Sequence, residues 1–390
     1  MPILESQRAR FDIPRNVAYL NCAYMSPLSH RVVAASQEGL VRKQRPWEMD
    51  PRDFFTLADR SRIAFARLLG GPATANDVAI VPAASYGMAV AARNLPVARG
   101  QSIVVLQDEF PSTVLTWREA ARARGATLVT VPRPADADWT EPVLAAIDQR
   151  TAVAALPHNH WFDGARLDLA RIRGRLTEVG ASLALDLTQS LGAARLDLGA
   201  VDPDFLVAAS YKWLMGPYSI GFLYVAPRWH GGEPLEHHWF GRLGSENFAG
   251  LTDYSAQFQP GARRFDVGEP ANFALLPGAV AAIEQILEWG VDNIAETAGA
   301  LVDEIVSRTA PLGWTAVPAP LRAPHYLGLR ARGGLPTDLA ARLAAAGVSV
   351  SIRGGQSLRI TPHVYNDAAD VDRLIEVLEH LTLPVAAAAR

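Results

Sequence analysis

The 390-residue sequence has almost no cysteine, and Cys22 is the only one. A single cysteine excludes an intramolecular disulfide and a cysteine-rich zinc site. A charge excess of one sign is also missing, since the formal net charge is −3 and no basic tract or charged tail occurs. The composition therefore gives no indication of nucleic acid or a membrane surface as a partner.

Long uncharged apolar runs are absent too, because none reaches the roughly 18 residues that a membrane-spanning helix needs. The segment Met1–Arg8 lacks a basic stretch followed by an apolar stretch, so we expect no signal peptide. With 49% hydrophobic and 20% charged residues, the composition is that of an ordinary globular protein. We therefore expect a soluble cytoplasmic protein of about two domains.

Lysine is the second scarce residue, since it occurs only at Lys43 and Lys212 and leaves 35 of the 37 basic residues as arginine. Lys43 lies in a polar stretch typical of a solvated helix end, whereas Lys212 lies in an apolar setting between two strand-like runs. A guanidinium group stays protonated and cannot form a Schiff base, whereas a lysine amine can. Lys212 is therefore a candidate catalytic residue, and the alternative is a chance lysine with its amine at the surface.

Short apolar runs alternate with helical patterns between about residues 20 and 270. The predicted strands are 78–81, 102–106, 127–131, 152–156, 182–186, 205–209 and 220–225. Strands that alternate with helices predict a mostly parallel sheet with helices on both faces. Only about ten residues separate the last two strands, so we expect antiparallel neighbours or a tight loop there.

The pattern changes after the proline- and glycine-rich stretch 259–272. We expect a long helix at 276–289 that continues after Gly290 to about 307, and further helices at 336–346 and 368–381. Strands are expected at 325–329, 349–352 and 357–360. The predicted fold class is therefore α/β, with a smaller C-terminal α+β domain. We place a large domain at 16–275 and a small domain at 276–390, to which the N-terminal segment 1–15 is joined.

In open α/β sheets the ligand lies beyond the carboxyl ends of the strands. Ser85 and Tyr86 follow the first strand at the start of a helical pattern, where backbone N–H groups and a hydroxyl suit a phosphate. A plain N-cap is the alternative. Phe110 follows the second strand, and it is suited either to stack on a flat aromatic ring or to be an ordinary core aromatic.

His158 and His160 follow the strand 152–156. A metal site would need a further ligand nearby, so we prefer a hydrogen-bonding wall of a binding site. Asp186 ends the next strand, where a carboxylate is unfavourable without a partner, and a protonated pyridinium nitrogen is a suitable one. A helix N-cap at Asp186 is the competing interpretation. Gln189 is placed to bond a phenolic oxygen on the same ring.

The strand 205–209 leads to Ser210, Tyr211 and Lys212, which are two hydroxyls beside an amine. These groups suit a phosphate and an aldehyde. Taken together, the strand ends require a phosphate, an aromatic ring with a basic nitrogen, and a carbonyl that accepts an amine. Pyridoxal 5′-phosphate (PLP) has all three, so we predict it as the cofactor.

With these residues in place, the sequence resembles the class V aminotransferase superfamily, which includes cysteine desulfurases, kynureninases and isopenicillin N epimerase-like proteins. The resembling segments are Tyr19-Leu-Asn-Cys-Ala-Tyr, Glu109-Phe-Pro-Ser, Asp186-Leu-Thr-Gln-Ser-Leu-Gly, Ser210-Tyr-Lys-Trp-Leu-Met-Gly-Pro, Arg264-Phe-Asp-Val-Gly-Glu-Pro and Leu358-Arg-Ile-Thr-Pro-His-Val-Tyr-Asn. They run from about residue 19 to 367. The resemblance implies the type I PLP-transferase fold and a homodimer.

The resemblance also implies roles for the candidate residues. Lys212 would form the Schiff base with the cofactor, Asp186 would keep its pyridine nitrogen protonated, and Gln189 would bond its ring oxygen. The remaining cofactor-binding residues would be Phe110 on the ring face, Ser85, Ser210 and Tyr211 at the phosphate, and Tyr86. The substrate-binding residues would be Arg359, which matches a carboxylate bidentately, together with Asn21 and His160.

Some positions depart from the family pattern. Gly268-Glu269-Pro270 stands where many members have Gly-Thr-Pro, a segment that typically reaches the partner's phosphate. Glu269 is a poor phosphate ligand because like charges repel, and Trp239 is expected near the same interface. Desulfurases need a nucleophilic cysteine in the C-terminal half, so persulfide formation is disfavoured, and Cys22 is expected to be a buried small hydrophobe.

The expected function is that of a PLP enzyme that forms an aldimine with an amino acid or small amine carrying a carboxylate. After the substrate amine displaces Lys212, the freed amine would act as the general base at Cα. We expect an aminotransferase. The alternatives are a carbon–sulfur or kynureninase-like β-lyase or an epimerase of the same fold, and a PLP-fold protein without turnover. The last is disfavoured because Lys212, Asp186 and Arg359 are all present.

Overall fold

The computed structural model describes residues 4–331 and 333–381. Its central element is a seven-stranded sheet with the strand order β2-β8-β7-β6-β5-β3-β4. The strands are β2 (Val78–Val81), β3 (Ser102–Leu106), β4 (Thr127–Val131), β5 (Thr151–Pro157), β6 (Ser182–Asp186), β7 (Phe205–Ala209) and β8 (Gly221–Val225). Neighbours pair in parallel except at β8, which runs antiparallel to both β2 and β7. The predicted mostly parallel sheet is confirmed.

The strands were predictable because the sheet is covered on both faces. Every residue of β2, β3, β5, β7 and β8 is buried, so these strands appear in the sequence as continuous apolar runs. The edge strand β4 is more exposed and carries polar residues between its apolar ones. The observed bounds agree with the prediction to within one residue at each strand end.

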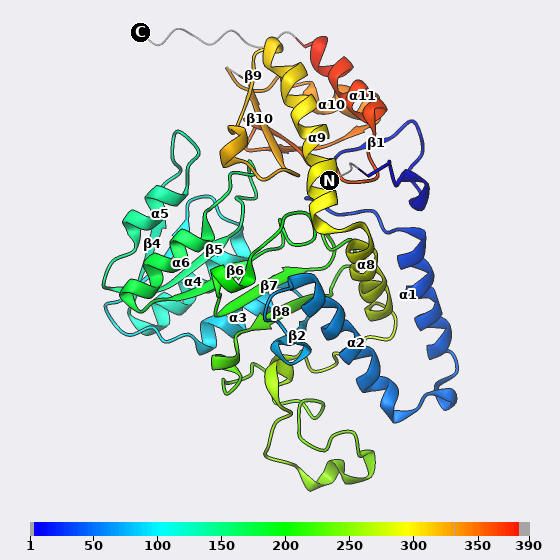
Figure 1. Ribbon diagram of the computed structural model, residues 1–390, viewed down its shortest axis with the longest axis vertical. Coiled ribbons are helices and arrows are strands. Elements are labelled where there is room, and N and C mark those ends of the chain that lie inside the picture. Colours follow the sequence, from blue (N-terminus) through cyan, green and yellow to red (C-terminus); the bar gives the residue numbers. More distant parts are fainter. Residues whose placement is uncertain (1–3, 332, 382–390) are drawn as a thin grey trace.

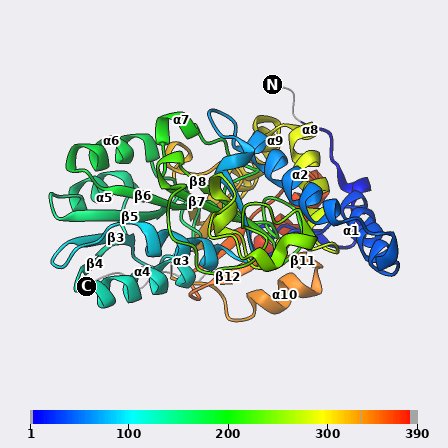
Figure 2. The same ribbon diagram turned by 90° about the horizontal axis from the view of Figure 1, so that it is seen from below.

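Two layers of helices enclose the sheet. Seen from below, α3 (Ala84–Asn94) and α4 (Pro111–Arg124) lie on one side, and α5 (Thr140–Ala146), α6 (Leu169–Val179) and α7 (Leu198–Val201) lie on the other (Figure 2). A separate hydrophobic cluster fills each side. Beyond the β2 edge, α1 (His30–Lys43) and α2 (Pro51–Leu69) both pack against α8 (Leu276–Trp289).

The C-terminal part of the chain forms a second, four-stranded antiparallel sheet with the order β12-β13-β10-β9. Its strands are β9 (Trp314–Ala316), β10 (Leu327–Ala331), β12 (Ser351–Arg353) and β13 (Ser357–Ile360), accompanied by the helices α9 (Val291–Thr309), α10 (Leu339–Ala345) and α11 (Ala368–Glu379). The N-terminal strand β1 (Ala18–Tyr19) pairs in parallel with β11 (Val348–Ser349), which ties the start of the chain to this part. The domain division at residue 275 stays a prediction.

Some features of the C-terminal part differ from the expectation. The predicted strand 349–352 is two short strands, β11 and β12, in two different sheets. Strand β9 was not predicted, because only Trp314 of its three residues is fully buried and no apolar run marks it. The helix expected from 276 to about 307 is interrupted at Gly290, whose φ of 81° separates α8 from α9.

The segment between β8 and α8 extends away from the rest of the molecule (bottom of Figure 1). It contains only short 3₁₀ helices. The 3₁₀ helices of the described chain are Arg8–Arg10, Pro46–Glu48, Ala75–Asp77, Pro227–Trp229, Phe248–Asp253, Gly261–Phe265, Ala310–Leu312 and Ala319–Leu321. Within residues 4–331 and 333–381, no helix has the length and apolar character required to cross a membrane.

Candidate active site

A cavity of about 440 Å³ opens at the carboxyl ends of the central strands. Its size is in the range of small-molecule sites in proteins. The residues that line it are Pro82, Ala83, Ala84, Ser85, Glu109, Phe110, Ser112, Pro157, Asn159, Trp161, Asp186, Thr188, Gln189, Ala209, Tyr211, Lys212, Tyr218 and Ser219. They come from loops after β2, β3, β5, β6 and β7, so the parallel strands bring together residues far apart in the sequence.

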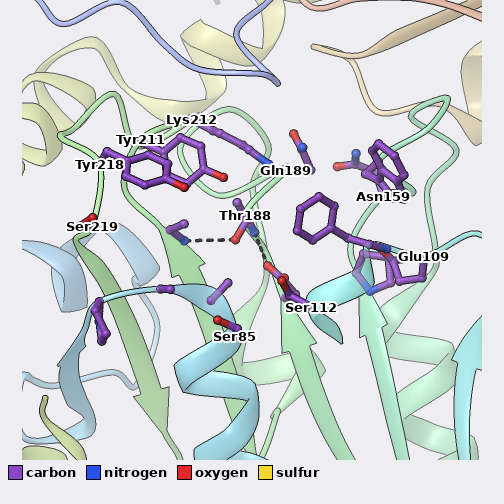
Figure 3. A pocket seen from close by; sticks show the side chains of 18 residues that line it. Ser85, Glu109, Ser112, Asn159, Thr188, Gln189, Tyr211, Lys212, Tyr218 and Ser219 are labelled. Carbon is purple, nitrogen blue, oxygen red and sulfur yellow. Dashed lines mark hydrogen bonds between the residues drawn. The ribbon is translucent and has the colours of Figure 1, made fainter. Parts of the chain in front are cut away.

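Lys212 lies three residues beyond β7, and its side chain reaches across the upper side of the cavity toward Gln189 (Figure 3). The residue is only 6% exposed, and its Nζ lies 5.2 Å from the ring centre of Phe110 and 5.4 Å from that of Tyr211. Burial lowers the pKa of the amine to about 8, although the negative charge of Asp186 opposes this shift. The neutral, nucleophilic fraction of the amine near neutral pH is therefore larger than that of an ordinary lysine.

Asp186 is the last residue of β6, and its half-buried carboxylate faces the cavity. Its Oδ1 accepts the backbone N–H of Thr188 at 2.9 Å, and its Oδ2 accepts the hydroxyl of Thr113 at 3.5 Å. No α-helix begins at this residue, because the backbone that follows makes turns up to about residue 194. The competing interpretation of Asp186 as a helix N-cap is therefore not supported.

The start of α3 and the loop after β7 also contribute to the cavity lining. The N-cap residue of α3, Ala83, has no side chain to cap the first backbone N–H groups, and it lines the cavity together with Ala84 and Ser85. The predicted phosphate-binding residue Ser210 does not line the cavity. It is buried, and its Oγ has no hydrogen-bond partner in the described structure. An added Cβ at Gly216 would lie 1.9 Å from this Oγ, so a glycine at this position leaves room for the hydroxyl of Ser210.

Gln189 and Phe110 also face the cavity. The amide of Gln189 is already oriented, because its Nε2 donates to the backbone carbonyl of Ala23 at 3.2 Å and its Oε1 accepts the indole N–H of Trp213 at 3.0 Å. One amide hydrogen of Gln189 remains for a ligand. Phe110 is the N-cap residue of α4, and its ring packs edge-on against Trp161. The amine of Lys212 lies over the ring of Phe110.

The structure does not bring Tyr86 and His160 into the cavity. The hydroxyl of Tyr86 donates to Glu236 at 3.0 Å, on the far side of the α3 terminus. His160 is fully buried, stacks on Trp139 at 5.1 Å and places its Nε2 3.1 Å from the carbonyl oxygen of Gln107. Burial lowers the pKa of His160 to about 4, so its ring is neutral at pH 7.

Asn21 and Arg359 lie next to the cavity wall formed by Trp161, but they do not line the cavity itself. Arg359 donates from Nη1 to the carbonyl oxygen of Trp161 at 3.4 Å and from Nη2 to the hydroxyl of Ser351 at 3.2 Å. Asn21 accepts the hydroxyl of Ser351 on its Oδ1 at 2.8 Å. The two predicted substrate-binding residues are thus joined through one serine that the sequence did not single out.

The lining residues that were not predicted as candidates include Glu109 and Asn159. Both are buried, and Oε2 of Glu109 and both amide atoms of Asn159 have no hydrogen-bond partner in the described structure. They lie together on the side of the cavity opposite Tyr211 and Tyr218 (Figure 3). Burial, reinforced by the charge of Asp186, raises the pKa of Glu109 to about 8. Their position directly after β3 and β5 was the available signal, since the same rule identified Asp186.

Three remaining candidates lie away from the cavity. Cys22 is fully buried, its Sγ lies 3.9 Å from the backbone oxygen of Lys212, and burial raises the pKa of the thiol, which disfavours a thiolate. Glu269 is exposed. Trp239 is part of an aromatic cluster with Phe54, Phe55, Phe240 and Phe248 at the base of the extended segment.

The described residues contain no cluster of three histidine, cysteine or acidic side chains that could hold a metal ion.

The cavity fits PLP on its own chemistry. Backbone N–H groups at the start of α3 and the hydroxyls of Ser85 and Tyr211 suit a phosphate, the carboxylate of Asp186 suits a protonated ring nitrogen, and the amine of Lys212, whose pKa is lowered to about 8, suits an aldehyde. The buried amide atoms of Asn159, which lines the cavity and has no hydrogen-bond partner, are atoms that a polar ligand would satisfy.

Comparisons with known proteins agree with this geometry. The family model described as Aminotransferase class-V matches residues 49–374. The chain is 25% identical to the uncharacterized aminotransferase YcbU of Bacillus subtilis over 97% of this chain and 98% of that protein. It is 29% identical to a kynureninase of Deinococcus radiodurans over 79% of this chain and 75% of that protein. The apo structure of a cysteine desulfurase from Thermococcus onnurineus superposes with a TM-score of 0.84 at 20% identity, covering 97% of this chain and 98% of that one.

Proposed function

The chain belongs to the class V aminotransferase family, whose cofactor is PLP, and from that premise we propose that it is an aminotransferase acting on an amino acid or small amine. The observation that carries the proposal is the pairing, in one cavity, of a buried lysine amine of lowered pKa with a carboxylate at the end of the neighbouring strand. A structural lysine would not be kept desolvated in this way.

We assign the candidate residues to the cofactor as follows. The N-terminus of α3, Ser85, Ser210 and Tyr211 would hold the phosphate, and Asp186 would face the ring nitrogen. Phe110 would cover one face of the ring. Gln189, with its one free amide hydrogen, and Asn159 would bond polar atoms at the ring edge. When bound, PLP supplies an aldehyde that reacts with amines and a ring that withdraws electrons from the substrate.

The residues of this chain supply binding and proton transfer. Asp186, which Thr188 and Thr113 hold in place, would hold the ring nitrogen of PLP and favour its protonated form. Nζ of Lys212 takes a proton from the substrate carbon and returns it, since a pKa of about 8 leaves the amine able to do both near neutral pH. The rings of Phe110 and Tyr211 beside Nζ limit its hydration.

A β-lyase is the second candidate, because a kynureninase is among the relatives. Two observations favour transamination over a lyase route through a cysteine persulfide. The uncharacterized aminotransferase YcbU matches this chain over nearly its whole length. The single cysteine is fully buried and held protonated, so it is unsuited to accept sulfur.

A spectroscopic amino-donor screen tests the proposal. The purified protein should show a band at about 410–430 nm that borohydride abolishes. Lys212→Ala should lack the band, whereas Lys43→Ala, which removes the only other lysine, should retain it. An amino donor should convert the cofactor to its amine form and yield a 2-oxo acid. Release of pyruvate, alanine or sulfide with the aldehyde form of the cofactor retained would instead identify a lyase.

We further propose that the protein is a homodimer. The extended segment between β8 and α8 supports this, because it carries apolar side chains that are exposed in the single chain, at Leu243, Phe248, Leu251 and Tyr254. Light scattering coupled to size-exclusion chromatography measures the mass directly, and a monomer would contradict the proposal. The cytoplasmic location stays a prediction.

A further inference from the structure

Two guanidinium groups converge on one serine hydroxyl beside the cavity. Nη2 of Arg359 donates to Oγ of Ser351 at 3.2 Å, and Nη2 of Arg353 donates to the same oxygen at 3.4 Å. The hydroxyl proton of Ser351 is directed to Oδ1 of Asn21 at 2.8 Å, which leaves the oxygen lone pairs to the arginines. The arrangement therefore holds two positive charges close together in a fixed position.

Neither charge is neutralised by the protein itself. Among the ion pairs between described residues, none involves Arg353 or Arg359, although most other arginines have an acidic partner. Arg359 is only 1% exposed, and the Nε atoms of both arginines are buried without a hydrogen-bond partner. Burial and the nearby charge of Arg359 both lower the pKa of Arg353.

The arginine pair lies beside Trp161, a residue of the cavity wall, without lining the cavity itself. The guanidinium of Arg353 lies 5.3 Å over the ring of Trp161, and Arg359 bonds the carbonyl oxygen of the same residue. Trp161 lines the cavity. Both arginines also act on the charge of Lys212, because each lowers the pKa of its amine. The pair and the reacting amine therefore belong to one electrostatic site.

The arrangement is unfavourable without a ligand. Two like charges on a shared hydroxyl repel each other, and the hydrogen bonds that the two guanidinium groups make in the described structure go to neutral oxygens, which compensate a desolvated charge less well than an anion does. Packing of Arg353 on Trp161 explains its position but not the absence of an acidic partner, since a neutral side chain would pack there equally well. A single carboxylate would satisfy Arg359 and leave Arg353 without an anion.

We propose that this site binds amino acids that carry a second carboxylate, with Arg359 at the α-carboxylate and Arg353 at the carboxylate of the side chain. Because both guanidinium groups bond one hydroxyl, the two carboxylates must be close together, as in aspartate and glutamate. That the ligand carries an amino group rests on the proposed function as an aminotransferase. The paired anion site itself does not depend on turnover.

Binding of dicarboxylates without an amino group tests the site directly. Titration calorimetry on the purified holoprotein should show glutarate or succinate binding at least about tenfold more tightly than butyrate, which has one carboxylate. Arg353→Gln should abolish this difference, and Arg353→Lys should retain part of it. Arg342→Gln is the control, since Arg342 is an exposed arginine of α10 that is paired with Asp338, and it should bind like the wild type.

Kinetics with matched donors provide the second measurement. Glutamate should exceed glutamine in kcat/KM by at least about tenfold, and Arg353→Gln should remove this preference mainly by raising the KM for glutamate. Equal binding of glutarate and butyrate, or an unchanged preference in Arg353→Gln, overturns the inference. A protein that binds glutarate tightly but lacks the 410–430 nm band would instead refute the proposed function and leave the paired anion site intact.

Discussion

The indole N–H of Trp213 donates to Oε1 of Gln189 at 3.0 Å, and this hydrogen bond links the residue after Lys212 to the far edge of the cavity. The backbone carbonyl oxygen of Gln189 lies 2.8 Å from Nε2 of His325, and the side-chain Nε2 of Gln189 donates to the backbone carbonyl of Ala23. Gln189 is therefore held from three sides by buried groups. Its remaining amide hydrogen has a fixed direction before any ligand binds, which is the pre-organisation that a binding site requires.

Trp213→Phe should lower both stability and cofactor affinity. The substitution leaves Oε1 of Gln189 buried without a donor, which destabilises the fold by about 1–3 kcal/mol in addition to the lost ring volume. Urea denaturation measures the first effect, and PLP titration measures the second. Trp139→Phe is the matched control, because the indole of Trp139 is also fully buried but its N–H has no partner. Equal losses in the two variants would show that the hydrogen bond contributes nothing.

Gly216→Ala should weaken PLP binding. The new Cβ would lie 1.9 Å from Oγ of Ser210, so the hydroxyl that we assign to the phosphate must move. We expect a loss of at least about tenfold in PLP affinity, the size of one hydrogen bond to a charged group. Ser210→Ala should lose a similar amount, and the double variant should lose little more than either single one. Additive losses would show that Gly216 and Ser210 act independently.

The sequence was sufficient for the sheet and for much of the cavity, for one physical reason. Buried parallel strands are apolar runs, and their carboxyl ends meet at one edge, so Ser85, Phe110, Asp186 and Lys212 were expected at one site before any contact was known. What the rule does not provide is the direction of each side chain after a strand ends. Asn159 faces the cavity and its neighbour His160 faces Trp139.

The paired arginines show a second limit. Arg359 could be proposed from its motif, but its surroundings come from three distant segments, with Asn21 near the N-terminus, Trp161 after β5, and Ser351 and Arg353 on β12. Their convergence depends on the parallel pairing of β1 with β11, a two-residue contact that leaves no periodic signal in the sequence. Tyr86 was misplaced for the same reason, because its partner Glu236 lies in the extended segment.

The stability of the apoprotein should fall between about pH 4.5 and pH 8 because of Glu109. Burial raises the pKa of this carboxyl to about 8, from its ordinary value of 4.5. Between these values the folded state binds the proton and the unfolded state does not, so a rise in pH destabilises the folded state. Glu109→Gln should therefore be more stable than the wild type at pH 8–9 and similar at pH 5. Urea denaturation at both pH values measures the difference, and Glu119→Gln, an exposed change on α4, should show neither effect.

The amine of Lys212 should react with acetic anhydride in the apoprotein with a midpoint near pH 8, because burial lowers its pKa to about that value. The unfolded chain binds this proton up to about pH 10 and the folded chain does not, so the contribution of Lys212 to stability is unfavourable at low pH and improves as the pH rises through this window.

Asp186→Asn removes a charge that raises the pKa of Lys212, so the midpoint of the labelling reaction should move to lower pH. Arg359→Gln removes a charge that lowers it, so the midpoint should move to higher pH. Mass spectrometry of the labelled peptide measures both shifts, with the exposed Lys43 as the reference for reagent activity. Shifts in the same direction would mean that the variants act through altered packing, and the electrostatic coupling of the carboxylate, the amine and the arginine pair would then be wrong.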